Sequence, residues 1–181
     1  MKLLLSSIVT SVLVFGSIGF AKDVDLKKSS LQWHGSKVTG KHYGKIFFEK
    51  ADVKMNDGKI SGGEFVVNMK TFTVDDLEGE WEKKFLTHMK SDDFFEVEKY
   101  PKSKLKIKSV KDGKATADLT IKDKTNEVTF DLKEKDGAYT GVLKFDRTKF
   151  GMIYGSGDFF KNLGDKMINN EVKVDFKLVL K

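Results

Sequence analysis

The sequence predicts an all-β fold, an eight-stranded antiparallel barrel with one amphipathic helix, and three observations support this prediction. Apolar and polar residues alternate along most of the chain after residue 22, which is the period of strands with one buried face. The pairs Asp57-Gly58, Asp112-Gly113 and Asp136-Gly137 supply the positive φ angles of tight hairpins, so neighbouring strands should be antiparallel. One segment, residues 75–89, instead has the four-residue apolar spacing of a helix.

The first 21 residues have the features of a cleaved signal peptide. An apolar run follows Lys2, and the small residues Gly19 and Ala21 occupy the positions that a signal peptidase requires. An uncleaved membrane anchor is the alternative, but the run falls short of the ~20 strongly apolar residues that span a bilayer. We therefore expect residues 1–21 to be a signal peptide and residues 22–181 to form one periplasmic or secreted domain.

The alternation places eight strands along this domain. Closing eight antiparallel strands into a barrel removes the exposed edges and leaves an interior for side chains or one small ligand. A sandwich of two sheets is the alternative. The strands are expected at residues 29–38, 44–55, 59–71, 103–111, 114–122, 126–135, 138–147 and 170–180.

The segment from residue 75 to 89 predicts a helix that lies across or beside the sheet. Asp75 followed by Glu78 resembles a capping box at its start. The helix leads into Phe94-Phe95, so helix and turn are expected to form one lid-like unit. Ordinary packing of the helix against the barrel is the alternative. The apolar face consists of Leu77, Trp81, Phe85 and Met89.

Composition and charge argue against several classes of protein. The net charge of +6 comes almost entirely from lysine, Arg147 is the only arginine, and the lysines alternate with apolar residues along strands, which disfavours nucleic-acid binding. The absence of cysteine excludes disulfides and the lipid anchor of a bacterial lipoprotein, so we expect no stable membrane anchor.

The sequence contains no recognisable catalytic, cofactor or metal motif. Gly155-Ser156-Gly157 has the wrong spacing for a nucleophile elbow, and no phosphate-binding glycine loop occurs. His34, His42 and His88 lack metal-ligand spacing, although they could converge in space. We therefore predict no catalytic residue, no cofactor and no bound metal.

Five stretches closely resemble the YceI-like family of exported bacterial proteins: WHGSKVTGKH (33–42), HMKSDDFFEVEKYP (88–101), LTIK (119–122), VTF (128–130) and FDRTKFGMIYGSGDFFKNLGDK (145–166). The resemblance spans essentially the whole chain after the signal peptide. It implies a lipocalin-like barrel whose apolar cavity binds a polyisoprenoid or a related long-chain amphiphile, with no known catalytic centre.

The predicted binding site combines the dry faces of the strands with the aromatic turns. Phe94-Phe95 and Phe159-Phe160 are expected to cover the cavity or, alternatively, to plug the barrel as core. Arg147 is expected to pair with Asp158 or Asp165 and pin a loop, or to meet a ligand's polar head. The full set of expected ligand-binding residues is Trp33, Phe47, Phe65, Val67, Trp81, Phe85, Met89, Phe94, Phe95, Leu105, Ile107, Leu119, Ile121, Phe145, Arg147, Phe150, Tyr154, Phe159 and Phe160.

The function predicted from these observations is binding of a long-chain isoprenoid, acyl or quinone-like lipid by a periplasmic carrier or sequestering protein. Two alternatives stay open. The chain could be an enzyme that acts on a lipid or quinone through an unrecognised site, or an exported structural or interaction protein whose barrel is filled by its own side chains.

Overall fold

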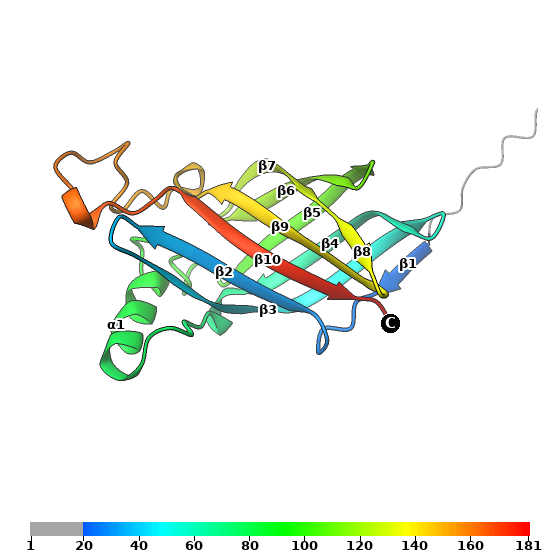
Figure 1. Cartoon of the computed structure of the whole chain (residues 1–181), viewed down its shortest axis with the longest axis horizontal. Helices are drawn as coiled ribbons and strands as arrows, with labels where there is room; N and C mark the ends of the chain where they lie inside the picture. The colour runs from blue at the N-terminus through cyan, green and yellow to red at the C-terminus, as the bar shows by residue number, and fades with distance from the viewer. Residues whose placement is uncertain (1–19) are drawn as a thin grey trace, which may run out of the picture.

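The strands pair into one antiparallel sheet that curls into a nearly closed barrel, as the computed structural model of residues 20–181 shows (Figure 1). The predicted barrel is therefore confirmed, and the sandwich is wrong. The strands are β1 (Phe20–Asp23), β2 (Ser30–Lys37), β3 (Gly40–Asn56), β4 (Lys59–Asn68), β5 (Lys102–Lys111), β6 (Lys114–Ile121), β7 (Lys124–Asp131), β8 (Lys133–Lys135), β9 (Ala138–Asp146) and β10 (Glu171–Val179).

The barrel closes through the chain segment that contains β7 and β8. The strand order is β7-β6-β5-β4-β3-β2-β10-β9-β8, so β7 pairs with β6 at one end of the sheet and β8 pairs with β9 at the other. Gly141 of β9 allows the close approach of β7, because a Cβ atom there would lie 2.2 Å from the carbonyl oxygen of Asp131. The strand expected at residues 126–135 is thus split into two short strands that join the sheet's ends.

The predicted hairpins form as expected. The Asp-Gly pairs at residues 57–58, 112–113 and 136–137 all have positive φ at both positions. A fourth two-residue turn, Lys122-Asp123, has the same conformation without a glycine, with φ angles of 49° and 56°. These four turns join four of the nine antiparallel strand pairs in the described chain: β3-β4, β5-β6, β6-β7 and β8-β9.

The N-terminal strand β1 is additional to the eight expected strands and pairs with β3. Its first two residues, Phe20 and Ala21, fall within the expected signal peptide, and the rest of that segment lies outside the described residues. Cleavage after Ala21 would leave Lys22 and Asp23 in the strand. The signal peptide stays a prediction.

Helix α1 (Gly79–Lys90) covers one end of the barrel (Figure 1). Glu78 occupies its N-cap without a side-chain hydrogen bond, so the expected capping box is wrong. The Asp75 carboxylate instead accepts a hydrogen bond from the Thr73 hydroxyl at 3.0 Å. No helix in residues 20–181 has the length and apolar character needed to cross a membrane. Three short 3-10 helices complete the fold: η1 (Met69–Thr71), η2 (Arg147–Phe150) and η3 (Gly164–Lys166).

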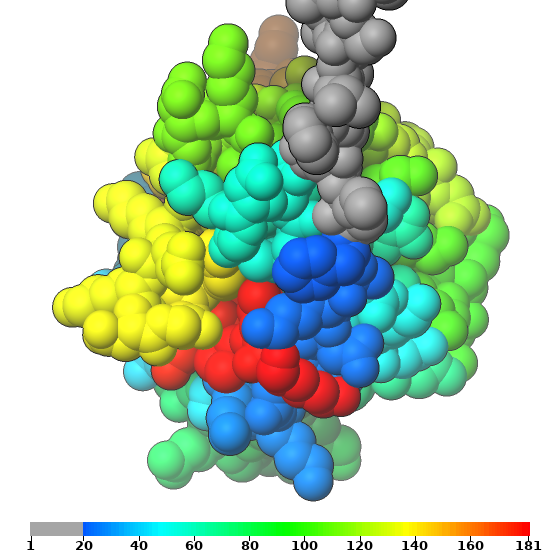
Figure 2. Space-filling view, turned by 90° about the vertical axis from the view of Figure 1, so that its right-hand side faces the viewer, coloured from blue at the N-terminus to red at the C-terminus, as the bar shows by residue number. Residues whose placement is uncertain are grey.

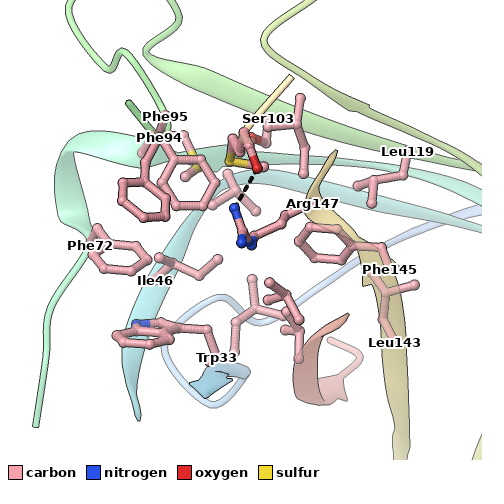
Figure 3. Close-up of a pocket in the computed structure, with 18 of the residues that line it drawn as sticks. Trp33, Ile46, Phe72, Phe94, Phe95, Ser103, Leu119, Leu143, Phe145 and Arg147 are labelled. Atoms are coloured by element: carbon pink, nitrogen blue, oxygen red, sulfur yellow. Dashed lines mark hydrogen bonds between the residues drawn. The ribbon is translucent and has the colours of Figure 1, made fainter. Parts of the chain in front are cut away.

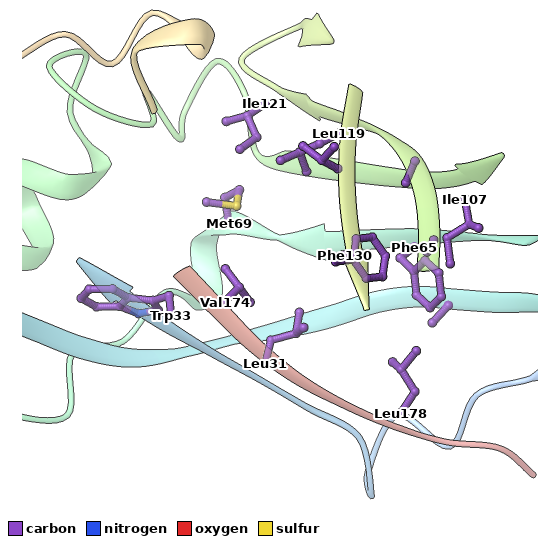
Figure 4. Close-up of a cluster of buried hydrophobic side chains, with 14 of the residues drawn as sticks. Leu31, Trp33, Phe65, Met69, Ile107, Leu119, Ile121, Phe130, Val174 and Leu178 are labelled. Carbon is purple, nitrogen blue, oxygen red and sulfur yellow. The ribbon is translucent and has the colours of Figure 1, made fainter. Parts of the chain in front are cut away.

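The barrel end opposite α1 is packed with side chains. In the space-filling view of this end, β1 and the end of β10 lie against each other beside the β8-β9 hairpin (Figure 2). Val24, Val53, Met55 and Ile60 are almost completely buried there. Further inward, the side chains labelled in Figure 4, such as Leu31, face the barrel interior around the space that remains there. The solid core therefore occupies one end of the barrel and leaves the α1 end for a site.

Candidate functional site

A cavity of about 450 Å³ lies inside the barrel and reaches the α1 end. Its wall comes from the inward faces of the strands, from α1 and from the segments that follow η1 and η2. Several inward apolar side chains are only partly buried, including Ile46, Phe48, Val67, Leu105 and Phe145. A densely packed core would bury such residues, so their exposure reflects real space inside the barrel. The volume is within the range of about 300–1,000 Å³ that small-molecule sites occupy.

A stack of aromatic rings forms one side of the cavity near α1 (Figure 3). The Trp33 ring stacks on Phe72 with 4.6 Å between ring centroids and on Phe85 with 5.9 Å. Trp33 Nε1 donates a hydrogen bond of 2.8 Å to the Thr73 carbonyl, which fixes the plane of the indole. Gly44 makes this possible, because a Cβ atom at that position would lie 2.1 Å from the same carbonyl oxygen.

The first twin-phenylalanine turn places both rings against the cavity. Phe94 and Phe95 are buried and line the wall, and the Phe95 ring lies 5.6 Å from Phe72. The turn folds back onto the end of α1, because the Ser91 carbonyl accepts hydrogen bonds from the amides of Phe94 and Glu96. Local backbone bonding thus directs this pair inward.

A second aromatic contact joins α1 to residues 151–168 across the cavity opening. The His88 ring packs edge-on against Tyr154 at 4.7 Å and against Phe94 at 5.1 Å, measured between ring centroids. The His88 Nε2 atom also contacts a carboxylate oxygen of Asp93 at 2.9 Å. These contacts hold the two flanking segments together at the opening.

The second twin-phenylalanine turn has the opposite orientation. Phe159 and Phe160 are 56% and 45% exposed and do not line the cavity. Their amides donate hydrogen bonds to the carbonyl of Ser156, a fully buried residue, so the turn itself is well ordered by backbone bonds. The expectation that this pair covers the cavity is therefore wrong.

Arg147 is the one buried charged side chain in the described residues, at 2% exposure, and it lies in the cavity wall (Figure 3). Its guanidinium donates hydrogen bonds to the carbonyls of Met152, Ile168 and Asn169. Burial lowers the pKa of Arg147, and the neighbouring Asp146 offsets part of that effect. The arginine therefore pins a loop as expected, but through carbonyl groups, and the expected ion pair with Asp158 or Asp165 is wrong.

The structure brings most of the expected site residues together. Those that line the cavity are Trp33, Phe65, Val67, Phe85, Met89, Phe94, Phe95, Leu105, Ile107, Leu119, Ile121, Phe145, Arg147 and Tyr154. Those outside the lining are Phe47, Trp81, Phe150, Phe159 and Phe160. Whether the lining residues bind a ligand stays a prediction.

The misplaced residues have physical explanations. Phe47 lies outside because the β3-β4 register shifts between Phe48 and Lys50, so Phe48 faces inward in its place. Trp81 is 72% exposed because the packed face of α1 is formed by residues 85, 86 and 89. Phe150 is fully buried behind the wall, with its ring edge-on to Phe145.

Some lining residues were missed although the alternation indicated them. Phe130, Val174 and Phe176 lie on strand faces whose parity marks them as inward, and they line the cavity. Phe72 and Met152 belong to irregular segments, where no period predicts the direction of a side chain.

The three histidines do not converge. His34, His42 and His88 contact three different aspartates, Asp175, Asp76 and Asp93. Among residues 20–181, no group of three metal-ligating side chains could hold a metal ion.

The fold and the site together define the class of protein: an antiparallel lipocalin-type barrel with an internal apolar cavity that opens beside a helix. The chain belongs to the YceI-like family, because the profile of the YceI-like domain matches residues 23–180.

Similar proteins agree with this assignment. The UPF0312 proteins SAB2563 and SAUSA300_2620 of two Staphylococcus aureus strains are each 33% identical over 99 residues, which is 49% of this chain and 56% of theirs. The chain thus matches about half the length of these curated relatives. Among solved structures, Burkholderia cenocepacia BcnA aligns with a TM-score of 0.63 at 22% identity, over 86% of this chain and 98% of BcnA. A polyisoprenoid binding domain from Saccharophagus degradans, implicated in plant cell wall breakdown, aligns with a TM-score of 0.56 at 13% identity, over 86% and 95% of the two chains. At these identities the structures support the fold alone.

Proposed function

We propose that this protein binds a long-chain amphiphilic lipid, a polyisoprenoid or a quinone-like molecule, inside the barrel, and acts as a periplasmic carrier or sequestering protein. The observation that carries the proposal is the cavity of about 450 Å³ whose inward apolar side chains remain partly exposed. An apolar ligand that covers this exposed apolar surface gains a binding free energy of about 25 cal/mol for each Å² removed from water. The same fold in a polyisoprenoid binding domain makes a polyisoprenoid the first ligand to test.

The lining favours a ligand with a long tail over a polar metabolite. Aliphatic and aromatic side chains dominate the wall from the opening to Leu132 and Leu178, close to the packed end. Polar groups such as Ser36, His42, His88 and Asn169 come from the strands and segments near the opening. This distribution suits a tail that enters the barrel and a head group that stays near the opening. A barrel filled by its own side chains would leave no cavity of this size.

The proposed role is binding without chemistry, in the compartment that a signal peptide would reach. The family resemblance supports a binding protein, and the N-terminal sequence supports export. An enzyme acting on the lipid is the competing proposal. Incubation of the purified protein with an extracted ligand, followed by mass spectrometry, separates them: a carrier returns the ligand at unchanged mass.

The decisive test is organic extraction of the purified protein followed by mass spectrometry. It compares the wild type with two variants in which tryptophan replaces one of two adjacent residues of β9. Leu143 lines the cavity, so Leu143→Trp should fill part of it and reduce the extracted lipid at least tenfold. Val142 is exposed on the other face of β9, so Val142→Trp should retain the wild-type amount. Circular dichroism confirms that both variants fold. Absence of lipid from the wild type, or equal amounts in both variants, would reject the proposal.

A further inference from the structure

Exposed apolar side chains gather around the cavity opening, and all of them except Tyr154 lie outside the cavity lining. Of the ten large apolar side chains exposed within residues 20–181, six lie on three segments: residues 36–41 at the β2-β3 hairpin, helix α1, and residues 151–168. We call these three segments the rim. The six side chains are Val38, Trp81, Ile153, Tyr154, Phe159 and Phe160.

The three segments of the rim lie at the same end of the barrel (Figure 1). The Val38 amide donates a hydrogen bond of 3.1 Å to the Met167 carbonyl, which ties the hairpin to residues 151–168. The His88 and Tyr154 rings tie the same segment to α1. Each of the three segments also contributes residues to the cavity lining, so the rim surrounds the opening.

The rim also carries an excess of positive charge. It contains seven lysines and four acidic residues. None of the seven lysines has a carboxylate within ion-pair distance in the described chain. Lys90 donates a hydrogen bond to the Lys70 carbonyl, and Lys84 Nζ lies 5.4 Å from the centre of the Trp81 ring. The seven lysines are Lys37, Lys41, Lys83, Lys84, Lys90, Lys161 and Lys166.

We propose that the rim docks the protein onto the surface of an anionic phospholipid bilayer, with the aromatic side chains inserted among the head groups. This inference rests on the proposed lipid-binding function. Tryptophan and other aromatic residues favour the boundary between water and hydrocarbon, and lysines beside them are attracted to anionic head groups. An exposed apolar patch of this kind needs a partner.

Docking in this orientation would bring the cavity opening against the bilayer. A lipid tail could then move between bilayer and barrel without crossing water, where exposed apolar surface costs about 25 cal/mol per Å². The outward direction of Phe159-Phe160 suits this role, because it leaves both rings free to contact a membrane.

Tryptophan fluorescence gives the most direct test, because the chain contains only Trp33 and Trp81. Trp33 is buried and Trp81 is 72% exposed, so the long-wavelength emission of a solvent-exposed tryptophan comes from Trp81. The chain from Lys22 onward, the expected product of signal-peptide cleavage, should be used after circular dichroism has confirmed that it folds, because it contains the whole matched domain, 23–180. Vesicles of equal parts phosphatidylglycerol and phosphatidylcholine should shift the emission to the blue, and Trp81→Phe should remove the shift.

Vesicle flotation with matched variants tests the rim itself. The triple variant Trp81→Ser, Phe159→Ser, Phe160→Ser should lower partition into the anionic vesicles at least tenfold. The control is Phe47→Ser with Val142→Ser, which removes two exposed apolar side chains from the barrel wall and should leave partition unchanged. Pure phosphatidylcholine vesicles should bind the wild type at least tenfold more weakly.

Ligand content separates failure of this inference from failure of the proposed function. The triple variant should still take up a lipid that is delivered from detergent micelles. Membrane docking is overturned if the triple variant partitions into the anionic vesicles as strongly as the wild type. It is also overturned if the control variant lowers partition as much as the triple variant does. Self-association of the wild type through the rim, seen as concentration-dependent size that the triple variant abolishes, overturns it as well. Vesicle binding with no lipid in the cavity would instead overturn the proposed function and leave docking standing.

Discussion

The two twin-phenylalanine turns have nearly identical local sequences, but their phenylalanine side chains have opposite orientations. Ser91-Asp92-Asp93-Phe94-Phe95 and Ser156-Gly157-Asp158-Phe159-Phe160 each place an acid before two phenylalanines, and in both a serine carbonyl accepts amide hydrogen bonds from the turn. The first pair is buried against the cavity and the second is about half exposed. Local chemistry therefore builds the turn, whereas the element that the turn follows decides where its rings point.

The difference comes from what lies beside each turn. The first turn continues from α1 and folds beneath it, so its rings meet Phe72 and Tyr154. The second turn extends from a segment that Arg147 ties to the barrel through three carbonyls, and no helix covers its outer side. We regard the first pair as part of the cavity and the second as part of the rim.

The largest expected effect is on the inner pair. Phe94→Ala with Phe95→Ala should lower the free energy of unfolding by at least about 3–5 kcal/mol, the loss typical of a single buried phenylalanine, because both side chains are buried and space is left behind. Urea denaturation measures this change, and extraction measures retained lipid. A loss below about 1 kcal/mol would show that the two turns are equivalent after all.

The next effect concerns the anchor of the outer turn. Arg147→Lys keeps a positive charge and loses the planar set of donors, so buried carbonyls of Met152, Ile168 and Asn169 lose their partners. We expect the free energy of unfolding of the ligand-free protein to fall by about 1–3 kcal/mol, and its melting temperature to fall with it. Normal ligand-free stability with weakened lipid binding would mean that Arg147 recognises a head group instead.

A smaller, pH-dependent effect is expected at Asp76, which joins the chain before α1 to β3. Burial raises the pKa of this carboxyl, but hydrogen bonds from the Tyr43 amide and the His42 ring outweigh it and hold the pKa below the ordinary value of 3.8. The ionised form is thus favoured by folding. Its stabilisation is complete above about pH 4 and disappears as the pH falls through the lowered pKa of the folded state.

The matching variant is Asp76→Asn. This substitution should lower the free energy of unfolding by about 1 kcal/mol at pH 7, and the difference in stability from the wild type should shrink below pH 4. Thermal melts of both proteins from pH 2 to pH 7 measure this. If the difference in melting temperature between the two proteins stays constant from pH 2 to pH 7, ionisation of Asp76 does not contribute to stability.

The smallest effect on stability is expected for the outer pair. Phe159→Ser with Phe160→Ser should change the free energy of unfolding by less than about 0.5 kcal/mol, because exposed side chains contribute little to the core. The same urea titration as for the inner pair measures it. A loss comparable to that of Phe94 and Phe95 would show that the outer rings pack against the barrel in solution.

The strands were predictable because their signals are local. The side-chain period of two and the Asp-Gly turns placed seven of the eight expected strands close to the bounds of one observed strand, and the eighth, 126–135, is split into β7 and β8. Most inward residues followed from parity. Phe47 shows where this reasoning fails: a register shift reverses parity at one point in β3, and a long strand gives no sequence signal for it.

By itself, the sequence determined the strands, the hairpins with their antiparallel pairing, and the apolar character of the interior, because period and turn chemistry act over a few residues. The choice of a barrel over a sandwich of two sheets came from the structure. Only the tertiary structure decided which end stays hollow, which face of α1 packs, and which phenylalanine pair reaches the cavity. Those outcomes depend on contacts between residues far apart in the chain, such as Trp33 with Phe72 and Phe85, and Arg147 with Ile168 and Asn169. Local patterns are nearly the same for Phe94-Phe95 and Phe159-Phe160, so the neighbours that folding supplies determine which pair is buried.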